Sequence, residues 1–393
     1  MKDKTKFYIG GDWVKPDAAH PFEVVNPSNG SICATISLGS ATDVDRAVQS
    51  AKAALPQWAA KPQAERTALI EAVLKSYIAR EDDMAAAISM EMGAPIDFAR
   101  DAQAYSGRWH IEGFLDAITK FDAEFPLHAG DTGEMIVHEP IGVCGLITPW
   151  NWPMNQVTLK VIPALLVGCS VVLKPAEIAP LSSMLLAEIL DEAGIPAGVF
   201  NLVNGDGLGV GAALSAHADV DMLSFTGSTR AGIAVGKSAM ETMKPATLEL
   251  GGKSPNLIFA DADVETAVRH CVTLCMENTG QSCNAPTRML VEQSVYDTAV
   301  EIAATAAQAI MVGRSDQTGA HIGPLVSQDQ FDTVQRYIQI GLDEGARLVA
   351  GGLGHPEGFE DGFFAHPTVF ADVDNKMRIA QEEIFGPVLT IIP

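Results

Sequence analysis

The chain has 393 residues, and its length divided by about 150 predicts two to three domains. Lysine and arginine total 26 against 49 aspartates and glutamates, so the formal net charge is −23, which argues against nucleic acid and anionic membranes as partners. The six cysteines are scattered, the N-terminus lacks the apolar stretch of a signal peptide, and no apolar run reaches the roughly 18 residues of a membrane span, so we expect a cytoplasmic protein.

The N-terminal region is predicted to open with a turn and a helix. Asn29 and Gly30 stand between two short strand-like runs and predict a hairpin turn. Apolar residues then recur along one face of residues 42–55, which predicts a helix that Thr42 and Asp45 cap and that ends before Pro56.

Residues 64–120 carry further helical patterns. Apolar side chains at helical spacing predict two helices between residues 64 and 92, and another helix over 96–120. The pattern changes at residues 121–140, where short strand-like pieces predict an extended arm outside the main core. Because a free strand edge favours pairing, this arm is a candidate for contact between copies of the chain.

Strand-like and helical runs alternate from residue 141 onward, which predicts a parallel sheet wound by right-handed crossovers. The first predicted strands cover residues 143–147, 170–173, 199–203 and 222–225. A second alternating segment predicts a second α/β domain. Its predicted elements are strands at 256–259, 289–291, 347–349 and 388–392 and helices at 264–276 and 330–344.

Three loops follow predicted strands of the first sheet, at residues 148–153, 174–177 and 226–232. Ligands of parallel sheets lie beyond the carboxyl ends of the strands. We therefore expect the three loops to lie together and to bind a nucleotide.

The first of these loops to suggest a coenzyme contains Lys174 and Glu177. Glu177 is a candidate to accept both hydroxyls of an adenine ribose, and it would repel a 2′-phosphate, so the pattern favours NAD over NADP. The alternative is an ordinary helix start with Glu177 in the first turn, where acidic residues are common.

The loop at 226–232 resembles a dinucleotide fingerprint whose middle glycine is replaced. Gly227 and Gly232 would allow close approach of a phosphate, and the free amides of a helix start near Ser228 would supply positive potential. A Gly-rich turn without a ligand is the alternative.

Asn151 lies between two tryptophans and two prolines, which restrict the backbone of its loop. A side-chain amide held in this way can donate to a developing oxyanion. The alternative is an ordinary asparagine turn.

Glu249, beside paired glycines, and Cys283, in a small polar turn, are the parts needed for covalent catalysis through a thiolate with a separate base. Each alone has a plainer interpretation, a solvated strand end for Glu249 and a small core residue for Cys283. A metal site is not predicted. The possible ligands His270, Cys271, Cys275 and Cys283 include no Cys-x-x-Cys pair.

Six motifs in this order resemble those of the aldehyde dehydrogenase superfamily over nearly the whole chain. They are Pro149-Trp150-Asn151-Trp152-Pro153, Lys174-Pro175-Ala176-Glu177, Phe225-Thr226-Gly227-Ser228-Thr229, Leu248-Glu249-Leu250-Gly251-Gly252-Lys253, Gly280-Gln281-Ser282-Cys283 and Glu382-Glu383-Ile384-Phe385-Gly386-Pro387. The resemblance implies NAD-dependent oxidation of an aldehyde to a carboxylic acid through a cysteine thiohemiacetal and a thioester.

The resemblance also assigns roles. It makes Cys283 the nucleophile, Glu249 the general base and Asn151 the oxyanion donor, working with the amide of Cys283. A helix terminus or the charge of the coenzyme is expected to lower the pKa of Cys283. The positions implied to bind NAD are Trp150, Lys174, Glu177, Gly227, Ser228, Glu383 at the nicotinamide ribose, and Phe385.

In domain terms, the resemblance implies a Rossmann-like NAD-binding domain over 1–120 and 141–251, an oligomerisation arm over 121–140 and a catalytic α/β domain over 252–393. Family members continue beyond the motif at 382–387, so the last domain is expected to be incomplete. A homodimer or homotetramer is implied for the full-length protein.

The chain departs from the family pattern at Pro286, where relatives commonly have glycine, and this predicts a differently shaped wall behind the nucleophile. Polar residues at positions expected near the aldehyde channel predict a substrate that carries polar groups. These positions are Met154, Asn155, Gln156, Met276 and Glu277.

Two other functions compete with this interpretation. A CoA-acylating relative would pass the acyl group to a thiol and has less use for a water-activating carboxylate, so Glu249 argues against it. A nucleotide-binding scaffold without turnover would not need Glu249, Cys283 and Asn151 together.

Overall fold

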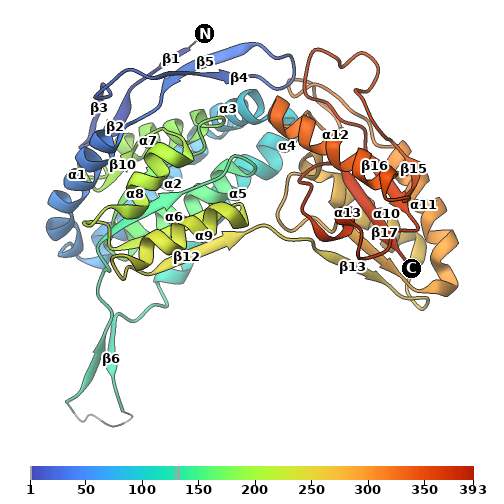
Figure 1. Ribbon diagram of the computed structural model, residues 1–393. Coiled ribbons are helices and arrows are strands. Elements are labelled where there is room, and N and C mark those ends of the chain that lie inside the picture. The colour runs from blue at the N-terminus through green and yellow to red at the C-terminus, as the bar shows by residue number, and fades with distance from the viewer. Residues whose placement is uncertain (1, 129, 131–132) are drawn as a thin grey trace. The chain divides into compact units, whose positions relative to one another are not determined.

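A computed structural model describes residues 2–128, 130 and 133–393 (Figure 1). Contacts within the chain divide it into two compact units. Unit 1 comprises the residues through Val24, Ala34–Ala87 and Arg100–Glu249, and unit 2 comprises Val25–Cys33, Ile88–Ala99 and Leu250–Pro393. Two short N-terminal segments thus group with the C-terminal part of the chain. The coenzyme and catalytic roles given to the domains stay predictions.

Unit 1 is built on a seven-stranded sheet with the order β12-β11-β8-β9-β10-β2-β3. The four strands β11, β8, β9 and β10 run parallel, as the alternating pattern predicted, and β2 and β3 extend the sheet antiparallel at one edge. The strands are β2 (Phe7–Ile9), β3 (Asp12–Val14), β8 (Val143–Ile147), β9 (Ser170–Lys174), β10 (Phe200–Leu202), β11 (Met222–Gly227) and β12 (Ala246–Leu250).

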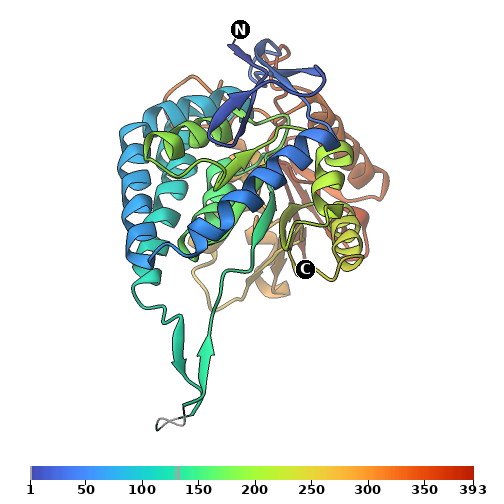
Figure 2. The same cartoon turned by 90° about the vertical axis from the view of Figure 1, so that its left-hand side faces the viewer.

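Every residue of β8 and β9 is buried, which is the signature of strands covered on both faces. The helices α1 (Ala41–Ala59), α6 (Pro153–Leu166) and α7 (Leu181–Glu192) pack on these strands or their neighbours, and Figure 2 shows α1 crossing the sheet. The other helices of unit 1 are α2 (Gln63–Ala79), α5 (Tyr105–Ile118), α8 (Ala212–Ala216) and α9 (Thr229–Met240). Helix α3 (Glu81–Met92) begins in unit 1 and ends in unit 2, and the short α4 (Ile96–Phe98) belongs to unit 2.

Helix α1 begins earlier and ends later than its sequence pattern indicated. The capping pair is Ser40 and Asp43, because the Asp43 amide donates to the Ser40 hydroxyl while the Ser40 amide donates to the Asp43 carboxylate. The prediction of Thr42 and Asp45 as the cap is therefore wrong. The helix also continues through Pro56 to Ala59, so the predicted end before Pro56 is wrong as well.

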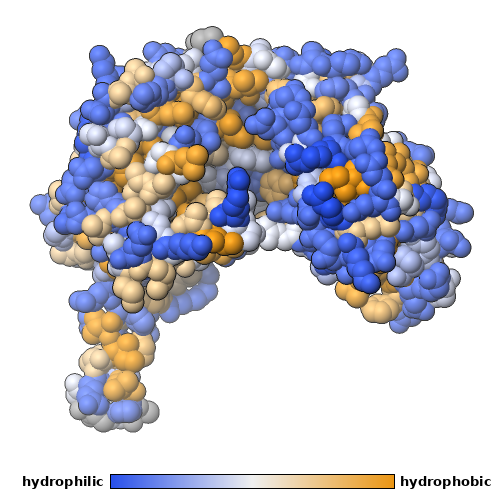
Figure 3. Space-filling model, viewed as in Figure 1, coloured by the Kyte–Doolittle hydropathy of each residue, from blue (hydrophilic) through white to orange (hydrophobic). Residues whose placement is uncertain are grey.

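The predicted arm is a hairpin of β6 (Glu124–Pro126) and β7 (Met135–Val137), which pair antiparallel and project from unit 1 (Figures 1 and 2). Apolar side chains lie exposed along it (Figure 3). They include Phe125, Leu127, Met135 and Val137. Of the predicted arm, Ala129, Asp131 and Thr132 lie outside the described residues. A further three-stranded sheet joins β1 (Lys2–Lys4), β5 (Ile32–Ser37) and β4 (Pro21–Val25).

Unit 2 contains a five-stranded sheet with the order β13-β14-β17-β16-β15, parallel except for β15. The second α/β domain expected from the sequence is therefore confirmed in its fold. Strand β16 and helix α11 had no clear sequence signal. The elements are β13 (Pro255–Ile258), α10 (Val264–Met276), β14 (Arg288–Val291), α11 (Tyr296–Gln308), α12 (Gln328–Asp343), β15 (Arg347–Ala350), β16 (Thr368–Ala371), α13 (Arg378–Gln381) and β17 (Val388–Ile392).

The two faces of this sheet carry separate apolar clusters, because alternate strand residues point to opposite sides. Val369 and Leu389 pack with residues of α10 and α11 in one cluster. Phe370 and Val388 pack with residues of α12 and α13 in the other. Helices therefore cover both faces of the sheet.

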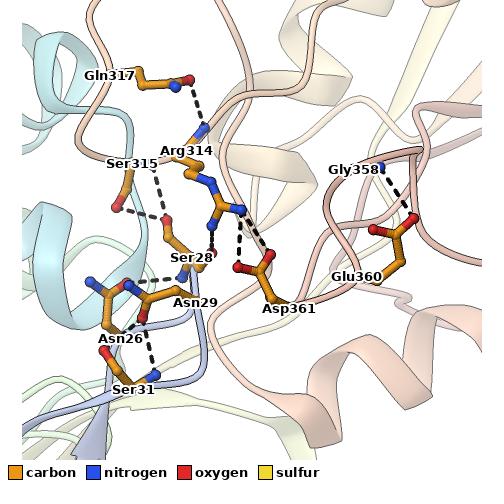
Figure 4. Close-up of polar contacts among 10 residues, drawn as sticks. All are labelled: Asn26, Ser28, Asn29, Ser31, Arg314, Ser315, Gln317, Gly358, Glu360 and Asp361. Carbon is orange, nitrogen blue, oxygen red and sulfur yellow. Dashed lines mark hydrogen bonds and ion pairs between the residues drawn. The ribbon is translucent and has the colours of Figure 1, made fainter.

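A polar cluster ties the segment Val25–Cys33 into unit 2 (Figure 4). The Ser28 hydroxyl donates to Ser315 Oγ at 2.8 Å and accepts from the Ser315 amide at 2.9 Å. The Arg314 guanidinium donates to the Ser28 carbonyl and pairs with Asp361 through both carboxylate oxygens. These contacts join residues almost 290 positions apart, and they explain why this N-terminal segment does not belong to unit 1.

Candidate functional site

The three candidate loops of unit 1 leave the sheet at the carboxyl ends of its parallel strands, as predicted. Ile147 pairs with Lys174 across β8 and β9, and Ile147 also pairs with Phe225 across β11. The carboxyl ends of three parallel strands are therefore in register. The chain proceeds from β8 outward through β9 and β10 and returns on the other side of β8 as β11, so these ends flank the point where the strand order reverses.

Lys174 and Glu177 form an ion pair with 3.1 Å between Nζ and Oε2. Lys174 is buried, whereas Glu177 remains partly exposed. Helix α7 begins only at Leu181, so Glu177 lies in a turn and the alternative of a first-turn helix residue is wrong. A carboxylate oriented by a buried cation at this sheet edge is well suited to accept ribose hydroxyls.

Gly227 ends β11, and Ser228 caps α9 by accepting a hydrogen bond from the Ala231 amide at 3.3 Å. Gly227 lies against the ring of Phe225, where an added Cβ would come within 2.7 Å of a ring atom. The first turn of α9 leaves amides without intrahelical partners, which is the feature that attracts phosphate.

Two buried hydroxyls in these loops have no hydrogen-bond partner within the described part of the chain: Thr148 Oγ1 after β8 and Thr226 Oγ1 in β11. Buried polar atoms are normally paired, so such atoms at one sheet edge mark a place for a polar ligand. The loops therefore fit a dinucleotide by their glycine, their helix start, their ion pair and their unpartnered hydroxyls.

Asn151 lies in the loop after β8, two residues before Pro153, the first residue of α6. Its side chain is 3% exposed, and Trp150 beside it is half-buried. The main-chain carbonyl of Asn151 accepts a hydrogen bond from Gln103 Nε2 at 3.0 Å. The loop is therefore fixed by its own prolines and by a distant helix.

Glu249 lies near the end of β12 and is exposed, which is the solvated strand end that its plainer interpretation described. Lys160 of α6 lies close enough for the Glu249 charge to raise its pKa, although burial dominates and lowers the pKa of Lys160. Glu249, Asn151, Lys174, Glu177, Gly227 and Ser228 all belong to unit 1.

Cys283 stands in a turn of unit 2 and is exposed. The chain reaches it from α10 through a 3₁₀ turn, Glu277–Gly280, in which Asn278 and Thr279 adopt the left-handed conformation with φ of 52° and 57°. Cys283 follows this 3₁₀ turn and precedes β14.

The residues before Cys283 are held by side-chain amides. Gln281 is fully buried, donates to the Asn278 carbonyl at 3.0 Å and accepts from the Val326 amide at 2.9 Å. The Thr279 hydroxyl donates to the Gly323 carbonyl at 2.9 Å. The exposed thiol thus follows a backbone with little freedom. Behind it, the Pro286 carbonyl accepts a weak hydrogen bond from Cys271 of α10.

Glu383 and Phe385 also belong to unit 2. A Glu383 carboxylate oxygen accepts from the Gly252 amide at 3.3 Å, and burial raises the pKa of Glu383. A Cβ added to Gly251 would overlap this carboxylate, so a glycine at position 251 is needed for the contact. Phe385 has a φ of 58°, and its carbonyl accepts from Gln330 Nε2 at 2.8 Å.

Lys253 follows the paired glycines, and the sequence assigned it no role. Burial lowers its pKa to about 8, and Nζ has no hydrogen-bond partner within the described part of the chain. Sequence reasoning also missed Gln103, Gln281 and Gln330, because a supporting amide has no local motif and its partner lies far along the chain.

Among residues 2–128, 130 and 133–393, no cluster of three or more His, Cys, Asp and Glu side chains has the arrangement to hold a metal ion. In the same ranges, no helix combines the length and the apolar character required to cross a membrane.

Comparison with known proteins gives one consistent result. Residues 13–393 match the model of the aldehyde dehydrogenase family. The chain is 51% identical over 394 residues to 3-succinoylsemialdehyde-pyridine dehydrogenase of a Pseudomonas species, covering all of this chain and 82% of that protein. It matches the crystal structure of an aldehyde dehydrogenase from Bartonella henselae with a TM-score of 0.99 and 56% identity, over 100% of this chain and 82% of that one.

Aldehyde dehydrogenase C of Pseudomonas syringae, solved as a cysteine-to-alanine variant with NAD+ and octanal, matches with a TM-score of 0.96 and 46% identity, over 99% of this chain and 79% of that one. The aldehyde dehydrogenase of Mycobacterium tuberculosis, solved with NAD+, matches with a TM-score of 0.96 and 42% identity, over 100% of this chain and 81% of that one. The chain belongs to the aldehyde dehydrogenase family.

Proposed function

We propose that the chain oxidises an aldehyde to a carboxylic acid through a thioester on Cys283. The observation that carries this proposal is the exposed thiol at the end of a turn fixed by buried amides. Of the six cysteines, all of which lie in the described ranges, four are buried, Cys33 is partly exposed and Cys283 alone is exposed. Nucleophilic cysteines need such access, whereas buried thiols are inert.

As a member of its family, the chain is an NAD-dependent aldehyde oxidoreductase. Crystals of the Pseudomonas syringae and Mycobacterium tuberculosis relatives contain NAD+. Lys174 and Glu177 would hold the adenine ribose, and Gly227, Ser228 and the start of α9 would hold the pyrophosphate. Trp150 and Phe385 would border the coenzyme, and Glu383 would turn from Gly252 to the nicotinamide ribose. Glu177 supports NAD over NADP because its charge opposes a 2′-phosphate.

In the proposed mechanism, the Cys283 thiolate attacks the aldehyde carbon, and the carbonyl electron pair moves to oxygen. The Asn151 side-chain amide and the Cys283 backbone amide donate hydrogen bonds to this oxyanion. The hydride on the same carbon would leave for bound NAD, which would supply the oxidant, and a thioester to Cys283 would remain. Glu249 then takes a proton from water, the hydroxide adds to the thioester carbon, and the carbon–sulfur bond breaks to release the acid.

Glu249 is also what disfavours the two competing functions. A CoA-acylating enzyme ends the cycle by transfer to a thiol and needs no base for water. A silent scaffold needs none of the three reactive residues. Product analysis with and without CoA separates the first alternative, because the hydrolytic enzyme turns over without CoA.

The sharpest test is Glu249→Gln, which should stop the cycle at the thioester. We expect a burst of NADH absorbance of about one equivalent per site followed by slow turnover. Intact-mass spectrometry should then find the acyl group on Cys283. Glu241→Gln, an exposed glutamate elsewhere in unit 1, should turn over normally. Absence of acyl-enzyme in Glu249→Gln would contradict the deacylation role.

The substrate is proposed to carry polar groups. Of the five positions considered, Met154, Gln156 and Met276 are buried, so Asn155 and Glu277 are the side chains presented to solvent. Asn155 is held by His110 with 2.6 Å between Oδ1 and Nε2. Two relatives differ in the polarity of their aldehydes. The Pseudomonas relative is named for a pyridine semialdehyde, whereas the Pseudomonas syringae enzyme was solved with octanal. A panel that showed strict preference for long alkyl aldehydes would overturn this choice.

A homo-oligomer formed through the hairpin of β6 and β7 completes the proposal. Exposed Phe125, Met135 and Val137 on a hairpin that projects from unit 1 support it. Val137→Asp should lower the mass found by sedimentation, whereas Glu139→Lys at the exposed base of the hairpin should not. A native chain that sediments as a monomer would count against the arm. The cytoplasmic location stays a prediction.

A further inference from the structure

The helix that contains Gln103 has an irregular middle. Residues Ile96–Phe98 and Tyr105–Ile118 are α-helical, and Ala99–Ala104 between them forms a π-helical turn. Such turns are rare, interrupt the normal hydrogen-bond ladder and recur at functional sites. At the last residue of this turn, the Ala104 carbonyl accepts a hydrogen bond from the Tyr77 hydroxyl at 2.7 Å.

Gln103 lies inside this π-helical turn and is completely buried. Its Nε2 donates to the main-chain carbonyl of Asn151 at 3.0 Å, 48 residues away. Four residues later, Gly107 brings α5 close to the first turn of α6, where an added Cβ would lie 2.9 Å from Met154 Cβ. The hydrogen bond from Gln103 and the close packing at Gly107 therefore both hold the Asn151 loop against this helix.

The bond acts on the peptide that follows Asn151. Trp152, the residue before α6, makes no side-chain cap, and Pro153 restricts Trp152 from the other side. Holding the Asn151 carbonyl fixes the rotation of this peptide and, with it, the direction in which the Asn151 side chain leaves the backbone. A small rotation there would move the amide of Asn151 away from its target.

We propose that Gln103 is a positioning residue that aims the Asn151 amide at the reacting oxygen. This inference rests on the proposed role of Asn151 as oxyanion donor. Because oxyanion stabilisation acts in the transition state, a misaimed amide should lower kcat and leave the binding of aldehyde and NAD nearly unchanged.

The test is a double-mutant cycle of Gln103→Met and Asn151→Ala in the full chain. Methionine keeps the length and burial of glutamine but removes the donor. Gln63→Met is the matched control, because Gln63 Nε2 also donates to a main-chain carbonyl of this helix, that of Ile118, at 3.1 Å. Each variant is measured for kcat, for KM of the aldehyde, for NAD affinity by calorimetry and for thermal unfolding.

Asn151→Ala should lower kcat by about 10²–10³-fold. Gln103→Met should lower kcat by about 10–10²-fold, with KM and NAD affinity changed by less than about threefold. In the Asn151→Ala background, Gln103→Met should lower kcat by less than about twofold, because the group it aims is gone. Gln63→Met should leave kcat unchanged.

Each other outcome overturns a distinct claim. If Asn151→Ala keeps its kcat, the oxyanion role fails and the inference fails with it. If Asn151→Ala loses kcat but Gln103→Met does not, or if the two losses multiply, the oxyanion role stands and the positioning role fails. Should Gln103→Met fail to fold, Gln103→Asn retains the amide but shortens its reach, and it must show the same loss confined to kcat.

Discussion

The turn of Asn151 and the turn of Cys283 carry the two groups that the proposed reaction needs first, yet they differ in exposure. Asn151 is 3% exposed in the loop that follows a buried parallel strand. Cys283 is exposed, after a helix end and a turn with left-handed residues. In both turns, however, a buried glutamine amide fixes the backbone, Gln103 for the first and Gln281 for the second.

This difference reflects what each group does. An oxyanion donor must already point correctly and gains from a dry setting, because fixed dipoles are worth more where water is excluded. A thiolate nucleophile must meet its substrate, and its thiolate needs solvent or positive charge. Two lysines show a similar contrast, since Lys174 pairs with Glu177, whereas Lys253 Nζ has no hydrogen-bond partner within the described residues.

The largest effect is expected from removing the nucleophile. Cys283→Ala should lower aldehyde oxidation by at least about 10⁴-fold, because no other group can form the thioester. NAD affinity by calorimetry should change little, since the variant changes none of the residues proposed to hold NAD. Cys33→Ala is the control, because Cys33 is the partly exposed cysteine, and this variant should keep full activity. Retained turnover in Cys283→Ala would show that Cys283 is not the nucleophile.

The rigidity of the Cys283 turn can be broken at Gly280. Its φ is 71°, and an added Cβ would overlap the Gly386 carbonyl oxygen. Because both strain and overlap involve backbone, Gly280→Ala should cost about 3 kcal/mol or more of stability. Thermal unfolding measures this loss, with Gly319→Ala as a glycine that also has positive φ but meets no atoms. Equal stability losses in the two variants would show that the overlap with Gly386 contributes nothing and that the strain of the positive φ accounts for the loss.

Lys253, whose Nζ has no hydrogen-bond partner within the described residues, predicts a pH dependence. Its folded pKa is lowered by burial to about 8 from 10.5, so between these values the unfolded chain binds the additional proton. The stability of the wild type should therefore rise with pH across this window relative to Lys253→Met, by roughly 1–3 kcal/mol in total. Unfolding temperatures of both proteins from pH 7 to about 10.5 measure the difference. A constant difference would show that Lys253 does not titrate there.

The smallest effect is expected at Glu177, the carboxylate that pairs with Lys174. Glu177→Gln keeps the shape of the side chain but removes the charge that opposes a 2′-phosphate. The ratio of kcat/KM with NAD to that with NADP should fall by about 10-fold. Glu188→Gln, which removes a partly buried carboxylate paired with Lys4 instead, should leave the ratio unchanged. An unchanged ratio in Glu177→Gln would assign coenzyme choice to other residues.

Several features of the molecule could be predicted because they depend on neighbours in the sequence. The apolar period from Val264 to Met276 predicted α10 with the bounds that the structure has. Alternating strands and helices predicted the parallel sheet, and the loops after β8, β9 and β11 do leave its edge together. Local pattern was less reliable at helix ends, where Ser40 and Asp43 form the cap instead of Thr42 and Asp45.

The sequence by itself determined the sheet pattern, the candidate residues and the family resemblance, because each follows from residue type and spacing along a short segment. Only the tertiary structure decided that Asn151 is buried and Cys283 exposed, that Glu177 lies in a turn, and that Glu383 rests on Gly252. It alone also decided which amides support them. The Gln103–Asn151 and Gln281–Val326 bonds span 48 and 45 residues, and such contacts arise from packing that no local spacing encodes.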